Sequence, residues 1–295
     1  QMVGLMNEVK ARGGMVTVHA TNGDMIDFLI AKNLSEGNTA PLYHYLSQPE
    51  ITEAEASERF ASIAGYTGCP GYIVHMTCEG ALNAVRDNNR HNQKVFAETC
   101  IQYLLLDASL YEQDFEGAKW VMSPPLREKK DQEALWAGIN QGLIQVVATD
   151  HCPFKWGQKL LGKDDFSKIP NGHPAIEHRV ELLYSEGVRK GRITMNKFVE
   201  VLSTNPAKIF GMFPQKGCIA PGSDADIVLF DPNIEHTISA STHHMNTDYS
   251  GYEGWQLTGK TKIVLLRGQV VIDDGKCLVD KGNGKFIKRN KVSQI

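Results

Sequence analysis

Three side chains that commonly ligate metals stand where short apolar runs of the sequence end. His19, His75 and Asp150 each close a run rich in apolar and β-branched residues. Such runs are typical of buried strands in a parallel sheet, which is covered on both faces. Because parallel strands bring their carboxyl ends to one rim, we expect the three side chains to converge there. Neutral imidazoles and a carboxylate suit a divalent metal, above all zinc, and so the sequence predicts a metal site at this rim.

Each of these residues also has a plainer interpretation. A single histidine at a strand end is more often a structural residue than a ligand. Asp150 could merely cap the turn before Pro153, which cannot continue a strand. His44 lies in polar surroundings and is expected to face solvent. Only the joint occurrence on three strands favours the metal site.

Other motifs are weaker candidates. Residues 157–163 have the spacing of a phosphate-binding loop, but Asp164 stands where serine or threonine would hold magnesium. No strand directly precedes this segment, so a nucleotide site is rejected. His243 and His244 are adjacent, and in a strand they would point to opposite faces. Cys152 is near the predicted site but has no visible base partner, which favours a packing role.

The elements that must position these residues alternate along the chain. Apolar periodicity and glycine or proline stops predict helices over residues 2–12, 23–34, 50–64, 79–88, 130–142, 175–187, 194–201 and 206–211. Strands are predicted over residues 15–20, 71–76, 94–99 and 144–149. Alternating strands and helices are typical of βαβ units and of a parallel sheet or barrel.

The pattern changes after residue 212. Residues 213–275 are predicted to form a β-rich layer, with a hairpin over residues 262–272 that turns at Arg267-Gly268. Residues 276–295 are basic, contain glycine and are expected to form a peripheral tail. The chain is therefore expected to divide into an α/β part over residues 1–212, the β layer and the tail.

The composition narrows the classes of function. The 295 residues are 42% hydrophobic and 22% charged, with a net charge of −3, which favours neither nucleic-acid nor membrane-surface binding. No apolar run is long enough to span a bilayer, and no signal peptide is visible. The six cysteines are scattered without a CxxC pair and are predicted to be reduced thiols in a cytoplasmic protein.

At these motifs the chain resembles the dihydropyrimidinase and D-hydantoinase family of the cyclic amidohydrolase superfamily. The similarity covers essentially the whole chain, in order. The Ser-Pro-Pro-Leu-Arg and Asp-His-Cys-Pro-Phe segments make it specific. The matching segments are residues 18–24, 74–78, 98–100, 123–127, 149–154, 169–172, 222–228 and 242–246.

The resemblance implies a (β/α)₈ TIM barrel with a small β-sandwich and two Zn²⁺ ions bridged by a carboxylated lysine. His19 and His75 then resemble ligands of one metal, and Asp150 resembles a ligand of the other and the proton shuttle. Ser123 and Asn171 match positions whose backbone groups hold the substrate. The implied reaction is hydrolysis of the cyclic amide bond of 5,6-dihydropyrimidines or hydantoins, with metal-bound hydroxide as the nucleophile. The resemblance also implies a homotetramer.

The chain departs from the family pattern in its metal ligands. It contains no His-x-His pair, and no lysine ends a strand before His19. We expect the pair and the bridging lysine to lie upstream of Gln1. The chain would then be the C-terminal part of the protein, with strands 5–8 of the barrel and the C-terminal part of the sandwich, and would be nearly inactive alone. The alternatives are a non-enzymatic assembly protein, an allantoinase-like amidohydrolase, or a separately encoded half.

Overall fold

The computed structural model describes residues 1–89 and 95–291, which form two compact units. The first unit comprises Gln1–Arg179 and Ile238–Gly254, and the second comprises Val180–Thr237 and the chain from Trp255 onward. The division expected from the sequence, after residues 212 and 275, does not follow these units, and it stays a prediction.

A four-stranded parallel sheet organises the first unit. Its strands pair in chain order, each parallel to the next. They are β1 (Val16–Val18), β2 (Gly71–Ile73), β3 (Val95–Cys100) and β4 (Val146–Ala148). All three residues of β2 are buried, as expected for a strand that is covered on both faces. The predicted parallel sheet is confirmed, although most of its strands are shorter than the apolar runs that predicted them.

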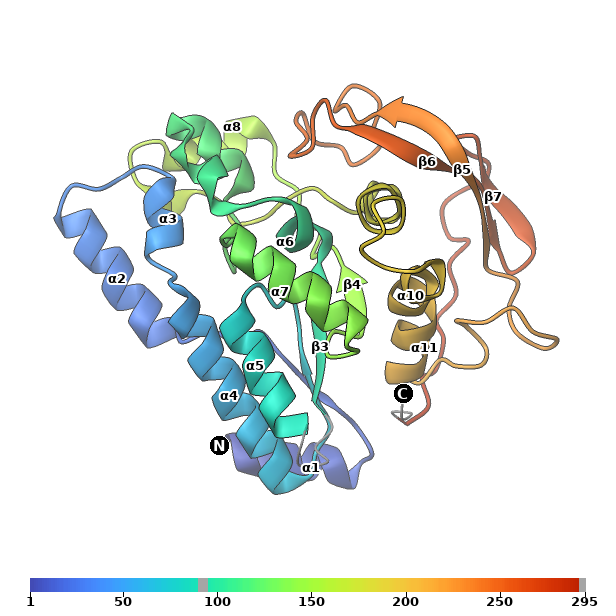
Figure 1. The fold of residues 1–295 in the computed structure, drawn as a ribbon, viewed down its shortest axis with the longest axis horizontal. Coiled ribbons are helices and arrows are strands. Elements are labelled where there is room, and N and C mark those ends of the chain that lie inside the picture. The colour runs from blue at the N-terminus through green and yellow to red at the C-terminus, as the bar shows by residue number, and fades with distance from the viewer. Residues whose placement is uncertain (90–94, 292–295) are drawn as a thin grey trace. The chain divides into compact units, whose positions relative to one another are not determined.

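Helices separate the strands and cover the sheet. The α-helices are α1 (Met2–Ala11), α2 (Gly23–Ser35), α3 (Leu42–Leu46), α4 (Glu50–Thr67), α5 (Glu79–Asn89), α6 (Ile101–Leu105), α7 (Lys129–Asn140) and α8 (Trp156–Lys159). The 3₁₀ turns are η1 (Ala108–Glu112), η2 (Asp114–Trp120), η3 (Leu160–Gly162) and η4 (Phe166–Lys168). Helix α5 packs between α4 and α7, and α7 crosses in front of the sheet in Figure 1. No described helix is both long and apolar enough to cross a membrane.

Two glycines allow the close packing of these layers. A Cβ atom on Gly71, at the start of β2, would lie 2.7 Å from the ring of Phe60 in α4. A Cβ atom on Gly138 in α7 would lie 2.8 Å from the Leu82 side chain in α5. Each fully buried side chain of this core, such as Leu82, contributes roughly 1.5–3 kcal/mol through removal of its apolar surface from water.

The second unit contains short helices and an antiparallel sheet. The helices are α9 (Arg179–Leu183), α10 (Met195–Val199) and α11 (Asn205–Ile209), with π-helical segments η5 (Tyr184–Val188) and η6 (Glu200–Thr204). The strands pair in chain order and are β5 (Ile227–Thr237), β6 (Gln256–Leu266), β7 (Gln269–Asp273) and β8 (Lys276–Cys277). The helix predicted from residue 175 begins only at Arg179.

The predicted hairpin turn at Arg267-Gly268 is confirmed. These two residues connect β6 to β7 and have φ values of 51° and 80°. Two successive residues with positive φ give the tight turn whose twist matches that of paired strands.

Candidate active site

Two of the predicted ligands meet at the rim of the parallel sheet. Nδ1 of His19 lies 2.8 Å from Nε2 of His75, so that the two rings share a proton or could share a metal. Thr21 Oγ1 lies 2.9 Å from the other nitrogen of His19, which fixes the ring from its far side. His19 follows β1 and His75 follows β2, and the pairing of these strands in parallel brings their carboxyl ends together.

Both imidazoles are held in the neutral form. Burial and the neighbouring His19 lower the pKa of His75 to about 3. Partial desolvation also lowers the pKa of His19, against the opposing charges of Glu53 and Asp150. A metal ligand must present an unprotonated nitrogen, and so the chemistry of this pair fits a metal such as zinc.

The backbone is strained at two of the predicted ligands. His75 and Asp150 have φ values of 42° and 47°, a region that residues other than glycine rarely adopt. Such a conformation costs about 1–3 kcal/mol and persists only where the surrounding structure enforces it, often at functional sites. Both residues lie just beyond a strand end, where the positive φ value changes the direction of the chain.

Asp150 lies just beyond the end of β4, close enough for its charge to act on His19. Burial raises the pKa of the Asp150 carboxyl group, and His19 opposes that shift. An upward shift favours a group that must both accept and release a proton near neutral pH. Within residues 1–89 and 95–291, however, no three His, Cys, Asp or Glu side chains form a group that could hold a metal ion. The full ligand set of His19, His75 and Asp150 stays a prediction.

The two predicted substrate-binding residues lie on neighbouring segments. Ser123 is half-buried and Asn171 is exposed. The N–H of Gly172 donates a hydrogen bond of 2.9 Å to the carbonyl of Val121, which joins the two segments. A Cβ atom on Gly172 would lie 2.2 Å from the carbonyl oxygen of Cys152, so only glycine permits this close approach. Their contact with substrate stays a prediction.

A half-buried carboxylate, which the strand-end pattern does not identify, supports His75. Glu98 of β3 accepts hydrogen bonds from the Tyr72 hydroxyl at 2.7 Å and from the His75 N–H at 3.4 Å. Burial raises the pKa of Glu98, and these two hydrogen bonds oppose the shift. The side chain was hidden from the sequence pattern because it lies within a strand and not at its end.

Replacing Tyr72 with phenylalanine is expected to destabilise the protein by about 1–3 kcal/mol, because the half-buried Glu98 carboxylate would lose the hydroxyl donor that the buried Tyr72 supplies. Urea unfolding of the variant and the parent measures this difference. Tyr66 is 82% exposed, and its replacement with phenylalanine provides the control. Equal stability of both variants would contradict the supporting role of Glu98.

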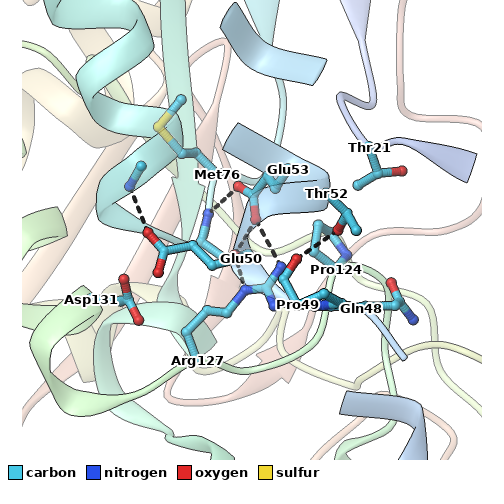
Figure 2. A network of polar contacts seen from close by, with 12 residues as sticks. Thr21, Gln48, Pro49, Glu50, Thr52, Glu53, Met76, Pro124, Arg127 and Asp131 are labelled. Carbon is cyan, nitrogen blue, oxygen red and sulfur yellow. Dashed lines mark hydrogen bonds and ion pairs between the residues drawn. The ribbon is translucent and has the colours of Figure 1, made fainter. Parts of the chain in front are cut away.

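A buried ion pair between Arg127 and Glu53 (Figure 2) lies between the segment that carries Ser123 and the segment that carries His75. Arg127 Nη2 lies 3.2 Å from Glu53 Oε2 of α4, and both side chains are at least 96% buried. Arg127 Nε donates to Thr77 Oγ1 at 2.9 Å, and the Thr77 N–H donates to Glu53 Oε1 at 2.8 Å. Burial acts to lower the pKa of Arg127, but the charge and hydrogen bond of Glu53, together with Cys78 and Tyr103, outweigh burial, and the net shift of the pKa is upward.

The weaker motifs resolve differently. Residues 157–163 lie on α8 and η3 and not after a strand, in agreement with rejection of a nucleotide site. His243 and His244 have different partners, the Thr247 carbonyl and the Glu177 carboxylate.

The expectation that His44 faces solvent is wrong, because this ring is buried and its Nε2 lies 2.8 Å from the carbonyl of Met122. The polar sequence around His44 gave no signal of the distant segment that covers it.

Comparison with known proteins establishes the family. Residues 1–271 match the model of the Amidohydrolase family. The D-hydantoinase of Geobacillus stearothermophilus is 49% identical over 288 residues, which cover 97% of this chain and 61% of that protein. The chain belongs to the amidohydrolase family. The D-hydantoinase of Ralstonia pickettii is 48% identical over 96% of this amidohydrolase chain and 62% of its own length.

Solved structures agree with this assignment. The dihydropyrimidinase from Brevibacillus agri NCHU1002 has a TM-score of 0.98 and 47% identity, and the match covers all of this chain and 64% of that one. The L-hydantoinase from Arthrobacter aurescens has a TM-score of 0.91 at 30% identity. The fold is thus that of the metal-dependent hydrolases with a TIM barrel, as the resemblance implied. The chain spans about three fifths of the length of these relatives, and its assignment to the second half of the barrel stays a prediction.

Proposed function

We propose that the protein containing this amidohydrolase chain opens the ring of 5,6-dihydropyrimidines or hydantoins by hydrolysis of a cyclic amide bond. The observation that carries the proposal is the meeting of two imidazoles at the rim of the sheet, where Nδ1 of His19 lies 2.8 Å from Nε2 of His75. The substrate class is supported by similarity to proteins named D-hydantoinase and dihydropyrimidinase.

The proposed site holds two zinc ions. His19 and His75 would hold one ion, and Asp150 the other. The bridging carboxylated lysine and the His-x-His pair would come from residues upstream of Gln1, in a homotetramer of the complete chain. When bound, zinc supplies a Lewis acid that polarises the amide carbonyl and lowers the pKa of a bound water to about 7.

The residues of this chain supply proton transfer and orientation. Asp150 accepts a proton from the attacking water as the water oxygen bonds to the amide carbon. It then donates that proton to the ring nitrogen as the carbon–nitrogen bond breaks. The second proton of the water stays on the new carboxyl group, which releases it to solvent, so that a carboxylate and an amide or ureido group result. Backbone groups of Ser123 and Asn171 hold the cyclic amide in line with this attack.

The direct test uses a chain extended upstream of Gln1. We expect it to bind zinc and to open dihydrouracil or a hydantoin, as followed by loss of the ring's ultraviolet absorbance. We expect residues 1–295 alone to be nearly inactive, because an open half-barrel would expose its sheet edges and lack the bridging ligand. Absence of both zinc and ring opening in the extended protein would overturn the proposal and favour the non-enzymatic assembly protein.

Replacement of either His19 or His75 by alanine is expected to reduce the zinc content of the extended protein from about two ions to about one. Each variant removes one of the two nitrogens that face each other, while Asp150 remains. Elemental analysis of the purified protein measures the loss. His244 is 72% exposed and pairs with Glu177, so its replacement with alanine should leave the zinc content unchanged.

A further inference from the structure

A buried lysine contacts three segments around the candidate active site. Lys159 closes α8, and its side chain is fully buried. Its Nζ donates hydrogen bonds to the carbonyls of Val121 at 2.9 Å, Pro170 at 2.7 Å and Gly172 at 2.9 Å. The same Nζ lies 5.5 Å from the centre of the Phe154 ring, within the range of a cation–π contact.

These partners surround the residues proposed to hold the substrate. Val121 lies two residues before Ser123, and Pro170 and Gly172 flank Asn171. The Val121 carbonyl also accepts the N–H of Gly172, so one oxygen joins both segments to the lysine. The Val121 segment and the Pro170–Gly172 segment are about fifty positions apart in the sequence. The Nζ atom of Lys159 donates hydrogen bonds to both of them.

The three N–H donors of the Lys159 ammonium group match the three acceptors around it. An ammonium group carries three N–H donors, and the three carbonyls use all of them. The acceptors are neutral, and burial lowers the pKa of Lys159 to about 7. Burying a cation against neutral oxygens is costly, and a core that needed only packing would be served better by an apolar side chain.

We propose that Lys159 is a positioning residue for the substrate, because its ammonium group sets the backbone of Ser123 and the backbone of Asn171 in mutual register. The inference rests on the proposed function, in which both backbones hold one cyclic amide. Lys159 acts through these segments and has no role in proton transfer or metal binding.

The test compares steady-state kinetics of Lys159→Met with the parent in the zinc-loaded, N-terminally extended protein, with dihydrouracil and hydantoin as substrates. Methionine keeps an unbranched side chain that is one atom shorter than lysine, and it removes all three donors. We expect KM to rise about tenfold or more, with a smaller change in kcat, because contacts to the bound ring act in the ground state as well as the transition state. The zinc content should not change.

A purely structural role gives a different result. It would reduce the fraction of folded enzyme, which lowers kcat and leaves KM unchanged. Lys163→Met is the matched control, since Lys163 is exposed in the same segment and should retain parental kinetics. If Lys159→Met does not fold, Lys159→Arg takes its place. Its planar guanidinium keeps the charge but cannot direct three donors from one atom, and a smaller rise in KM is expected.

The outcomes separate the two proposals. If the parent is active and the folded Lys159 variant has the same KM as the parent, the positioning role is overturned and the proposed function stands. A parent that binds zinc and opens neither ring overturns the proposed function, and the positioning role falls with it. A rise in KM that accompanies loss of zinc would place Lys159 with the metal ligands and would also overturn the inference.

Discussion

Replacement of Asp150 with alanine is expected to lower kcat for ring opening by about 10²–10⁴-fold, the range that positioned proton transfer contributes. The carboxyl group is the proposed carrier of the proton from the attacking water to the leaving nitrogen. Its raised pKa and its strained position after β4 support that role. Single-turnover and steady-state assays of the zinc-loaded, extended protein measure the effect.

Two further variants separate proton transfer from loss of negative charge or of fold. Asp150→Asn keeps the shape of the side chain but cannot carry the proton, so its kcat should fall as far as that of Asp150→Ala. Asp164→Ala removes an exposed carboxylate from the loop that follows, and it should retain the parental kcat. Ring opening by Asp150→Ala at close to the parental rate would exclude Asp150 as the proton shuttle.

The sequence predicts functional residues where their type and a local pattern of apolar residues occur together. His19, His75 and Asp150 could be singled out because each closes an apolar run, and parallel pairing then brought two of them within 2.8 Å. The hairpin turn at Arg267-Gly268 was predictable for the same reason, since a two-residue turn is specified by adjacent residues. The strained φ values were not predictable, because they arise from the tertiary structure that encloses the strand ends.

The supporting residues could not be predicted from local pattern. Lys159 appeared only as part of a rejected phosphate loop, yet its partners include a carbonyl 38 positions earlier in the chain. Arg127 belongs to a matching motif, but its partner Glu53 is 74 positions away, on a helix that the sequence predicts without indicating this partner. His44 was misjudged for the same reason. Burial of a charged or polar side chain can be predicted only when its distant partner is known, whereas an apolar run by itself predicts a buried segment.

Replacement of Arg127 with methionine is expected to destabilise the protein by about 3–5 kcal/mol, because Glu53 would remain as a buried and uncompensated charge. The loss follows from desolvation, since both side chains of the pair are almost completely buried. Urea unfolding of the extended protein measures the free energy. Arg59→Met on the same helix removes an ion pair whose side chains are 56% and 38% exposed, and it should have little effect.

The double variant Glu53→Gln with Arg127→Met tests the physical cause. A glutamine amide can still accept a hydrogen bond from the Thr77 N–H, but it leaves no buried charge without its partner. We therefore expect the double variant to be more stable than Arg127→Met alone, with a coupling energy of about 0.5–3 kcal/mol. If the two changes are simply additive, packing of the Arg127 side chain and not its charge holds the Ser123 and His75 segments together. Because those segments carry the proposed substrate and metal contacts, we expect Arg127→Met to bind less zinc than the parent, and we expect the double variant to recover zinc binding together with stability.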